Sequence, residues 1–203
     1  MYKKILSYIF IHNLANNKEV TYNELCKIFS TTCVDQLLPQ LIENSFIKQE
    51  GTRLILTPKG REQLIVVLTG GVYDLLHRGH LTTLSESKNL GDVLIVVIAR
   101  DTTVEKNKRK PIHNEVDRVY LINSIKCVDL AILGDLQDHM KVVKKIQPNI
   151  ITLGSDQTHR INQLKKQLEE IDLSMIQLIR LEVDYEDMAT TKVINEILNR
   201  NSS

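Results

Sequence analysis

The sequence has few of the features that mark several large protein classes. Its three cysteines, Cys26, Cys33 and Cys127, are odd in number and show no C-x-x-C spacing, which favours free thiols in a reducing compartment. No apolar run approaches the roughly 18 residues of a membrane span. A basic start is followed by polar residues and no small-residue cleavage site, so we expect no signal peptide and a cytoplasmic protein.

The charge balance gives no sign of a polyanionic partner. The 26 basic and 25 acidic residues leave a formal net charge of +1, so the whole chain carries no electrostatic argument for nucleic acid or membrane binding. The sequence also lacks internal repeats and low-complexity linkers. A length of 203 residues, with 42% hydrophobic and 25% charged residues, is ordinary for a globular protein of one or two domains.

Residues 1–62 predict a small helical domain with a hairpin. Thr21 and Glu24 have the spacing of a capping box, and Thr57-Pro58 has the form of a helix start. Pro39 should bend or restart the third helix. This order resembles a winged helix-turn-helix module. The expected helices span 2–14, 21–29 and 33–42, and the expected strands span 46–48 and 53–56, around a turn at Glu50-Gly51.

The presumed recognition helix of that module is poorly suited to DNA. Residues 31–44 contain no Lys or Arg but do contain Asp35 and Glu43, whereas proteins that read DNA grooves need basic residues for phosphate contacts. We therefore expect dimerisation or interdomain packing from this module. A DNA-binding regulator with a nucleotide-sensing C-terminal domain is the alternative from a different class.

From Leu64 onward, strand and helix patterns alternate. Strands separated by helices of this length predict right-handed βαβ units. We expect an α/β domain over 63–203 with a Rossmann-like, doubly wound parallel sheet. The expected strands are 64–69, 93–99, 130–133, 149–153 and 175–181, and the expected helices are 80–90, 115–125, 138–146, 161–170 and 190–199.

The most informative stretch runs from Gly70 to His80, G-G-V-Y-D-L-L-H-R-G-H. It places His77 and His80 between a buried strand with a Gly-Gly turn and a helix. That junction is the phosphate-binding end of an open α/β sheet. An H-x-x-H spacing alone also occurs in surface residues and metal sites, but here the context favours catalysis.

The pattern G-x-[FY]-D-x-x-H-x-G-H resembles the cytidylyltransferase-like nucleotidyltransferases. Within them, residues 64–159 are most similar to the archaeal FAD synthetases, which adenylylate FMN. The resemblance covers about half of the chain, fades after residue 160 and does not include residues 1–62. The matching stretches are 90–104, 108–112, 128–134 and 146–158.

The resemblance implies transfer of a nucleoside monophosphate from an NTP to a phosphorylated acceptor, with release of pyrophosphate. It assigns His77 and His80 to the NTP phosphates. A basic loop follows the second strand and contains Lys106, Lys108, Arg109 and Lys110. Lys108 and Lys110 are the favoured phosphate ligands in it, with Arg109 close behind. Taken alone, these four residues would favour a solvated surface run.

Further nucleotide-binding residues follow from the same resemblance. Arg118 lies near substrate phosphate or forms an ion pair with Glu115, and Asp74 orients a ligand or the metal shell, or stabilises the turn. Thr190 and Thr191 bind phosphates at a helix N-terminus or simply cap that helix. The remaining candidates are Gly71, Val72 and Tyr73 in the turn, with Gly154 and Asp156 around the base and ribose.

The identity of the substrates stays open at this point. FMN with ATP is favoured by residues 90–158, while Thr190-Thr191-Lys192 looks more like glycerol-3-phosphate cytidylyltransferase. Two departures from the family also bear on the substrate: Val72 lacks the usual hydroxyl, and three carboxylates lie within 183–187. The family further implies Mg²⁺ held mainly by the NTP phosphates, without protein ligands, and a homodimer.

Overall fold

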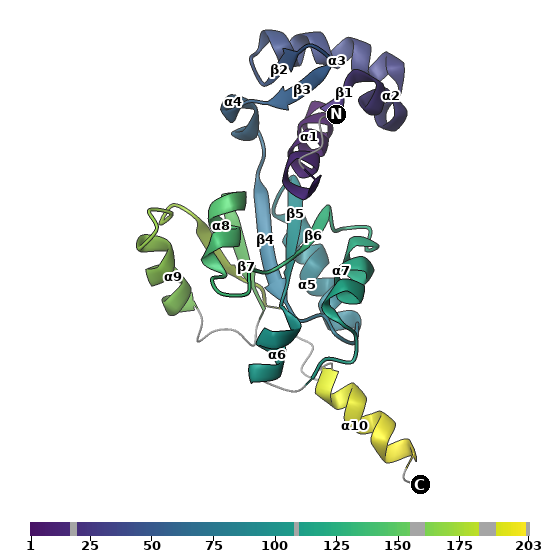
Figure 1. Ribbon diagram of the computed structural model, residues 1–203, viewed down its shortest axis with the longest axis vertical. Coiled ribbons are helices and arrows are strands. Elements are labelled where there is room, and N and C mark those ends of the chain that lie inside the picture. The colour runs from purple at the N-terminus through teal and green to yellow at the C-terminus, as the bar shows by residue number, and fades with distance from the viewer. Residues whose placement is uncertain (17–19, 108–109, 155–160, 183–189, 202–203) are drawn as a thin grey trace. The chain divides into compact units, whose positions relative to one another are not determined.

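The computed structural model describes residues 1–16, 20–107, 110–154, 161–182 and 190–201. The chain divides into two compact units, Met1–Ile65 and Val66–Ser203 (Figure 1). In the described part of the chain, no helix is both long and apolar enough to cross a membrane.

The first unit combines helices with a small antiparallel sheet. Its strands are ordered β1-β3-β2, and Val20 of β1 pairs with Leu54 of β3. The two-residue strand β1 was not predicted. The helices are α1 (Tyr2–Asn16), α2 (Tyr22–Phe29), α3 (Thr31–Glu43) and α4 (Pro58–Arg61), and the strands are β1 (Val20–Thr21), β2 (Ile47–Glu50) and β3 (Arg53–Leu56).

Two helix starts in this unit are confirmed. Thr21 and Glu24 form a reciprocal capping box at α2, and the Thr57 hydroxyl accepts a hydrogen bond from the backbone N–H of Gly60 at the start of α4. The third predicted helix exists, but α3 begins at Thr31, two residues before the predicted start, and continues through Pro39 without restarting. Its buried face, made by Val34, Leu38 and Leu41, offsets the backbone hydrogen bond that a proline removes.

The second unit is an α/β domain with five parallel strands in the order β6-β5-β4-β7-β8. This confirms the predicted doubly wound sheet. Its strands are β4 (Val66–Gly71), β5 (Val93–Ile98), β6 (Leu130–Leu133), β7 (Ile150–Leu153) and β8 (Gln177–Arg180); its helices are α5 (Arg78–Asn89), α6 (Asp101–Asn107), α7 (Glu115–Asn123), α8 (Met140–Ile146), α9 (Ile161–Glu169) and α10 (Thr190–Asn201).

Both faces of this sheet are covered by helices. Right-handed crossovers place α5 and α7 on one face and α8 and α9 on the other (Figure 1). The central strands are therefore buried on both sides; Leu94, Ile95 and Val96 of β5 are fully inaccessible. Such strands have continuous apolar runs rather than alternating ones, which is why the sequence shows them clearly.

The strand order reverses between β4 and β7. The chain builds β5 and β6 on one side of β4 and then returns to place β7 on the other side. Ligands of open α/β sheets bind beyond the carboxyl ends of the strands at such a reversal. Beneath this point, the buried hydroxyls of Ser87 and Thr152 lie 2.8 Å apart and join α5 to β7.

Two local predictions in this unit were wrong. Gly70 and Gly71 are the last residues of β4, paired with Val97 and Ile98, so they form no turn. The segment after β5 is also not a plain loop. Residues 101–107 form helix α6, anchored by buried Val104, and so place Lys106 on a helix.

Candidate active site

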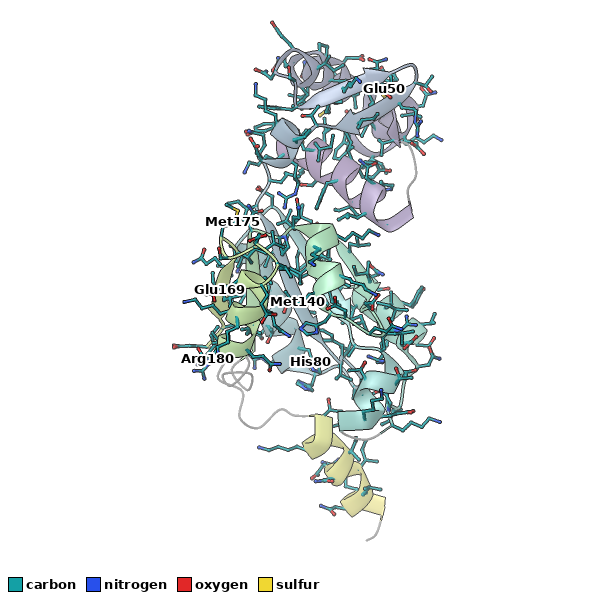
Figure 2. The ribbon with its side chains drawn as sticks, turned by 60° about the vertical axis from the view of Figure 1, so that its left-hand side comes forward. Glu50, His80, Met140, Glu169, Met175 and Arg180 are labelled. Atoms are coloured by element: carbon teal, nitrogen blue, oxygen red, sulfur yellow. The ribbon has the colours of Figure 1, made fainter. Side chains whose placement is uncertain are left out.

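His77 and His80 stand at the N-terminus of helix α5. His77 occupies the N-cap position with extended backbone, and its side chain makes no capping hydrogen bond. His80 lies in the first turn, and the two rings stack with their centroids 3.9 Å apart. Figure 2 shows His80 at the end of the sheet where α6 and the start of α10 also lie. Backbone N–H groups and two imidazoles thus converge where an anion would be stabilised.

The Tyr73 ring supports this pair from below. Tyr73 adopts the left-handed conformation, with φ of 52°, and its buried ring lies 5.2 Å from the His80 ring, centroid to centroid. Burial raises the pKa of the Tyr73 phenol to about 12, so the hydroxyl stays protonated. A non-glycine residue in this conformation is uncommon and costs roughly 1–3 kcal/mol, so the surrounding structure must hold the turn in place.

Gly71 is the residue that makes room for Tyr73. A Cβ atom at Gly71 would lie 2.7 Å from Cε2 of the Tyr73 ring, closer than real contacts allow. At the neighbouring Gly70, the nearest atom to a Cβ would be the Val97 carbonyl oxygen at 3.5 Å, an ordinary contact. The glycine at 71 is therefore required by packing, not by its backbone angles.

Partial burial also affects the charge state of His77. Partial burial lowers the pKa of the His77 imidazole, which favours the neutral ring at neutral pH. Its buried Nδ1 has no hydrogen-bond partner within the described residues. A buried polar atom without a partner is rare in structures and often marks a functional position.

The Asp74 side chain is buried and is directed toward the backbone of residues 112–113. Its carboxylate accepts hydrogen bonds from the backbone N–H groups of Ile112 and His113, each at 2.9 Å. The His113 ring adds a third link, because its Nδ1 lies 2.9 Å from the Asp74 carbonyl oxygen. Of the predicted roles for Asp74, these contacts favour stabilisation of the turn.

Arg118 is also buried, with none of its surface exposed. Its guanidinium donates to the backbone carbonyls of Val72, Ala99 and His113, at 2.6, 2.8 and 3.2 Å. It forms an ion pair with Asp101 at 2.6 Å. The predicted ion pair between Arg118 and Glu115 was wrong, because the Glu115 carboxylate lies 3.3 Å from the Arg100 guanidinium instead. These contacts favour a role in holding three loops together over direct contact with phosphate.

Those of the other candidates that the structure describes lie at the same end of the sheet as the histidines. Gly154 directly follows β7 at the strand reversal, and Lys110 is exposed. The stretch from Val72 to His80, here called the histidine turn, leads from β4 into α5. The Thr190 hydroxyl, at the start of α10, lies 3.5 Å from the Leu75 carbonyl oxygen and so brings that helix to the histidine turn. Three predicted residues, Lys108, Arg109 and Asp156, lie outside the described residues, as does the side chain of Thr191.

Two residues of the site were missed by sequence reasoning. Asp101 was detectable, since it follows the carboxyl end of β5 at the edge where the histidines lie. His113 had no such signal, because it belongs to no regular element and its link to Asp74 spans 39 residues. Over the described ranges, no group of three His, Cys, Asp or Glu side chains could hold a metal ion.

Comparison with known proteins decides the family. The model of the cytidylyltransferase-like family matches residues 68–196. The chain belongs to this family. The match confirms the predicted nucleotidyltransferase class, and it begins beyond the first unit.

Two of the similar proteins are named FAD synthases. The FAD synthase of Aciduliprofundum boonei is 39% identical over 139 residues, which cover 68% of this chain and 93% of that protein. The FAD synthase of Thermoplasma acidophilum is 46% identical over 111 residues, which cover 55% of this chain and 78% of that protein.

Two solved structures are also similar. A crystal structure from Thermoplasma volcanium, described as a lipopolysaccharide core biosynthesis protein, has 42% identity and a TM-score of 0.58, covering 60% of this chain and 99% of that one. A protein of unknown function from Archaeoglobus fulgidus has 12% identity and a TM-score of 0.51, and it shares the fold alone.

Proposed function

We propose that this chain is an FMN adenylyltransferase, which makes FAD from ATP and FMN. The observation that carries the proposal is the stacked pair of His77 and His80 at the N-terminus of α5. The pair lies in a domain 39% identical to an FAD synthase over nearly that protein's full length. The geometry supports chemistry on phosphate, and the relatives favour FMN and ATP as the substrates.

The proposed reaction is a single in-line displacement. A phosphate oxygen of FMN attacks the α-phosphorus of ATP and forms a new P–O bond. The bond from the α-phosphorus to the bridging oxygen breaks, and that oxygen leaves with its electron pair as part of pyrophosphate. His77 and His80 would donate hydrogen bonds to oxygens whose negative charge grows; a single donor of this kind contributes about 10²–10³ in rate. No protein nucleophile is required, so positioning and charge carry the catalysis.

ATP would enter as its magnesium complex. The phosphates themselves would carry most of the contacts to the cation. Lys110, with Lys108 and Arg109, would neutralise the triphosphate. Thr190 and Thr191 would bind its far end at the N-terminus of α10, a role supported by the closeness of Thr190 to Leu75.

The remaining residues would shape the nucleotide site. Gly71, Val72 and Tyr73 would line the site next to the histidines, a role supported by the Tyr73 ring, which lies beside His80 and is packed against Gly71. Gly154 and Asp156 would face the base and ribose, since β7 ends beside β4 at the strand reversal. Arg118 would act on the substrate only through the loops that it holds.

A second candidate is a cytidylyltransferase that acts on a small phosphate ester such as glycerol 3-phosphate. The Thr190-Thr191-Lys192 sequence favours it, together with the placement of Thr190 beside the histidine turn. Both reactions use the same phosphate-binding residues, so only substrates can separate them. A pyrophosphate-release panel should cross ATP and CTP with FMN, glycerol 3-phosphate and phosphocholine. We expect pyrophosphate release only for the pair of ATP and FMN. Pyrophosphate release for the pair of CTP and glycerol 3-phosphate instead would select the second candidate.

For the first unit we propose a winged-helix domain that supports a homodimer or packs within the protein. Its three-stranded sheet and helices α2 and α3 have the order of such a module. Helix α3 contains no Lys or Arg, which disfavours DNA recognition. Nanomolar, sequence-specific DNA binding at physiological salt would overturn this view and favour a nucleotide-sensing regulator.

A further inference from the structure

The segment that begins with α6 at Asp101 and ends at Glu115 has both of its ends at the same place on the sheet edge. Asp101 and Glu115 exchange hydrogen bonds there: the Asp101 N–H donates to the Glu115 carboxylate at 2.8 Å, and the Glu115 N–H donates to the Asp101 carboxylate at 3.1 Å. Arg118 joins the same point through Asp101. The two ends of the segment are thus fixed to each other and to the carboxyl edge of the sheet.

A second attachment joins this segment to the histidine turn. The Asp74 carboxylate accepts from the N–H groups of Ile112 and His113, and the His113 ring binds the Asp74 carbonyl. Since a carbonyl oxygen can only accept, Nδ1 of His113 must carry the hydrogen. All three bonds tie the return of the segment to one residue of the histidine turn, and Asp74 is 3% exposed.

This attachment limits where Lys110 can lie. Lys110 precedes Ile112 by two residues and Asp74 precedes His77 by three. Consecutive Cα atoms are about 3.8 Å apart, so the Lys110 Cα stays within about 8 Å of the Ile112 Cα. Arg118 also joins the histidine turn to this return, through the carbonyls of Val72 and His113. The Asp74 contacts add bonds at Ile112 and His113, two and three residues after Lys110.

We propose that Asp74 and His113 are positioning residues for nucleotidyl transfer. They hold residues 110–113 on the histidine turn, so that the Lys110 ammonium and the His77 and His80 rings address the same triphosphate. This inference rests on the proposed function. It assigns to Asp74 a role through Lys110, not through contact with substrate.

A double-mutant cycle between Asp74 and Lys110 separates positioning from a purely structural role. The full-length chain is assayed with ATP and FMN as wild type, Asp74→Ala, Lys110→Ala and the double variant. A hydrogen bond to a charged group is worth roughly tenfold or more, so we expect about a tenfold loss in kcat/KM for ATP from Asp74→Ala, mostly as a higher KM. The same change in the Lys110→Ala background should cost less than about twofold, because coupled residues are not additive.

Matched variants control this cycle. Lys166 is an exposed lysine of α9, and Asp74→Ala should keep its full effect when combined with Lys166→Ala. Asp74→Asn should recover most of the activity, since the side-chain oxygen that accepts both N–H groups remains. Equal losses in both lysine backgrounds would overturn the proposal and leave Asp74 a stabiliser of the fold.

His113 offers an independent test. Asn places an N–H near the position of Nδ1, whereas Gln places one near Nε2. His113→Asn should stay within about twofold of wild type, and His113→Gln and His113→Ala should each lose about fivefold, the value of one neutral hydrogen bond. Rescue by Gln but not by Asn would show that His113 acts through Nε2 on the substrate, contrary to the proposal.

A binding measurement keeps failure of this inference distinct from failure of the proposed function. Calorimetry with α,β-methylene-ATP and magnesium needs no acceptor, and the same coupling between Asp74 and Lys110 should appear in Kd. Coupling in Kd without FAD formation would support the positioning role and reject FMN as acceptor. FAD formation by the wild type with additive effects in the cycle would reject the positioning role alone.

Discussion

Replacing Gly71 with Ala tests whether the histidine turn depends on the position of the Tyr73 ring. The new Cβ would lie 2.7 Å from Cε2 and 3.0 Å from Cζ of Tyr73, and the ring is buried and packs beside His80. The ring therefore has to shift, and His80 shifts with it. The variant should lose stability and activity together.

The expected magnitudes follow from these contacts. Overpacking of this kind costs about 1–3 kcal/mol, while a Gly to Ala change at an accessible backbone conformation returns about 0.4–1 kcal/mol. The net loss in the free energy of unfolding should thus lie between about 0 and 2.6 kcal/mol, with a centre near 1.3 kcal/mol. A displacement of about 1 Å in a catalytic group can cost about 10²-fold, so we expect kcat to fall by about 10- to 100-fold.

Gly70→Ala is the matched control, because its Cβ would meet only ordinary contacts at 3.5 Å and beyond. It should change stability by less than about 0.5 kcal/mol and leave kcat within about twofold. Urea unfolding and steady-state FAD synthesis measure both effects. Combining Gly71→Ala with Tyr73→Leu should remove most of the clash, so the two changes should not be additive. Equal behaviour of the two alanine variants would refute the argument.

Three further predictions concern the histidines and the first unit. His77→Ala and His80→Ala should each lower kcat by about 10²–10⁴ with little change in the urea midpoint, and near-normal turnover at saturating ATP and magnesium would remove them from the mechanism. The His77 ring should titrate below its ordinary pKa of about 6.5 without ligand, as seen by NMR of the imidazole, and magnesium-ATP should raise that pKa. The neutral ring is favoured in the fold, so its contribution to stability is complete above the unfolded pKa and is lost as the pH falls below it; an unshifted titration would contradict the burial argument. Deleting residues 1–62 should leave a folded domain with measurable transfer, because the described site residues all lie beyond residue 70; complete loss in a folded truncation would show that the first unit completes the acceptor site.

The sheet and its helices were predictable because their signals are local or periodic. The apolar runs of β4, β5 and β7 indicate buried strands, and the five predicted strands all exist, with ends shifted by at most two residues. The shift at β4 arose from Gly70-Gly71, which sequence reasoning took as a turn. The reason lies in contacts outside the local sequence. Both glycines pair with β5, and Gly71 packs against the ring of Tyr73.

The candidate site was predictable in its histidines and much less so in its supporting contacts. His77 and His80 carry a short motif with a fixed relation to a helix start, which is information within one segment. The partners of Arg118 and Asp74 come from residues 5 to 46 positions away, and they include backbone carbonyls and N–H groups that no residue type reveals. For this reason both side chains resembled phosphate or metal ligands in the sequence, whereas their contacts bind the loops together.

The central claim is attack on the α-phosphorus of ATP at the His77 and His80 site, and labelled ATP tests it most directly. The wild-type chain, with magnesium and FMN, should transfer label from [α-³²P]ATP into FAD. Label from [γ-³²P]ATP should appear only in pyrophosphate, and His80→Ala should slow both by about 10²-fold or more. Appearance of the γ-label on the flavin, or α-label transfer at an unchanged rate in His80→Ala, would contradict the account.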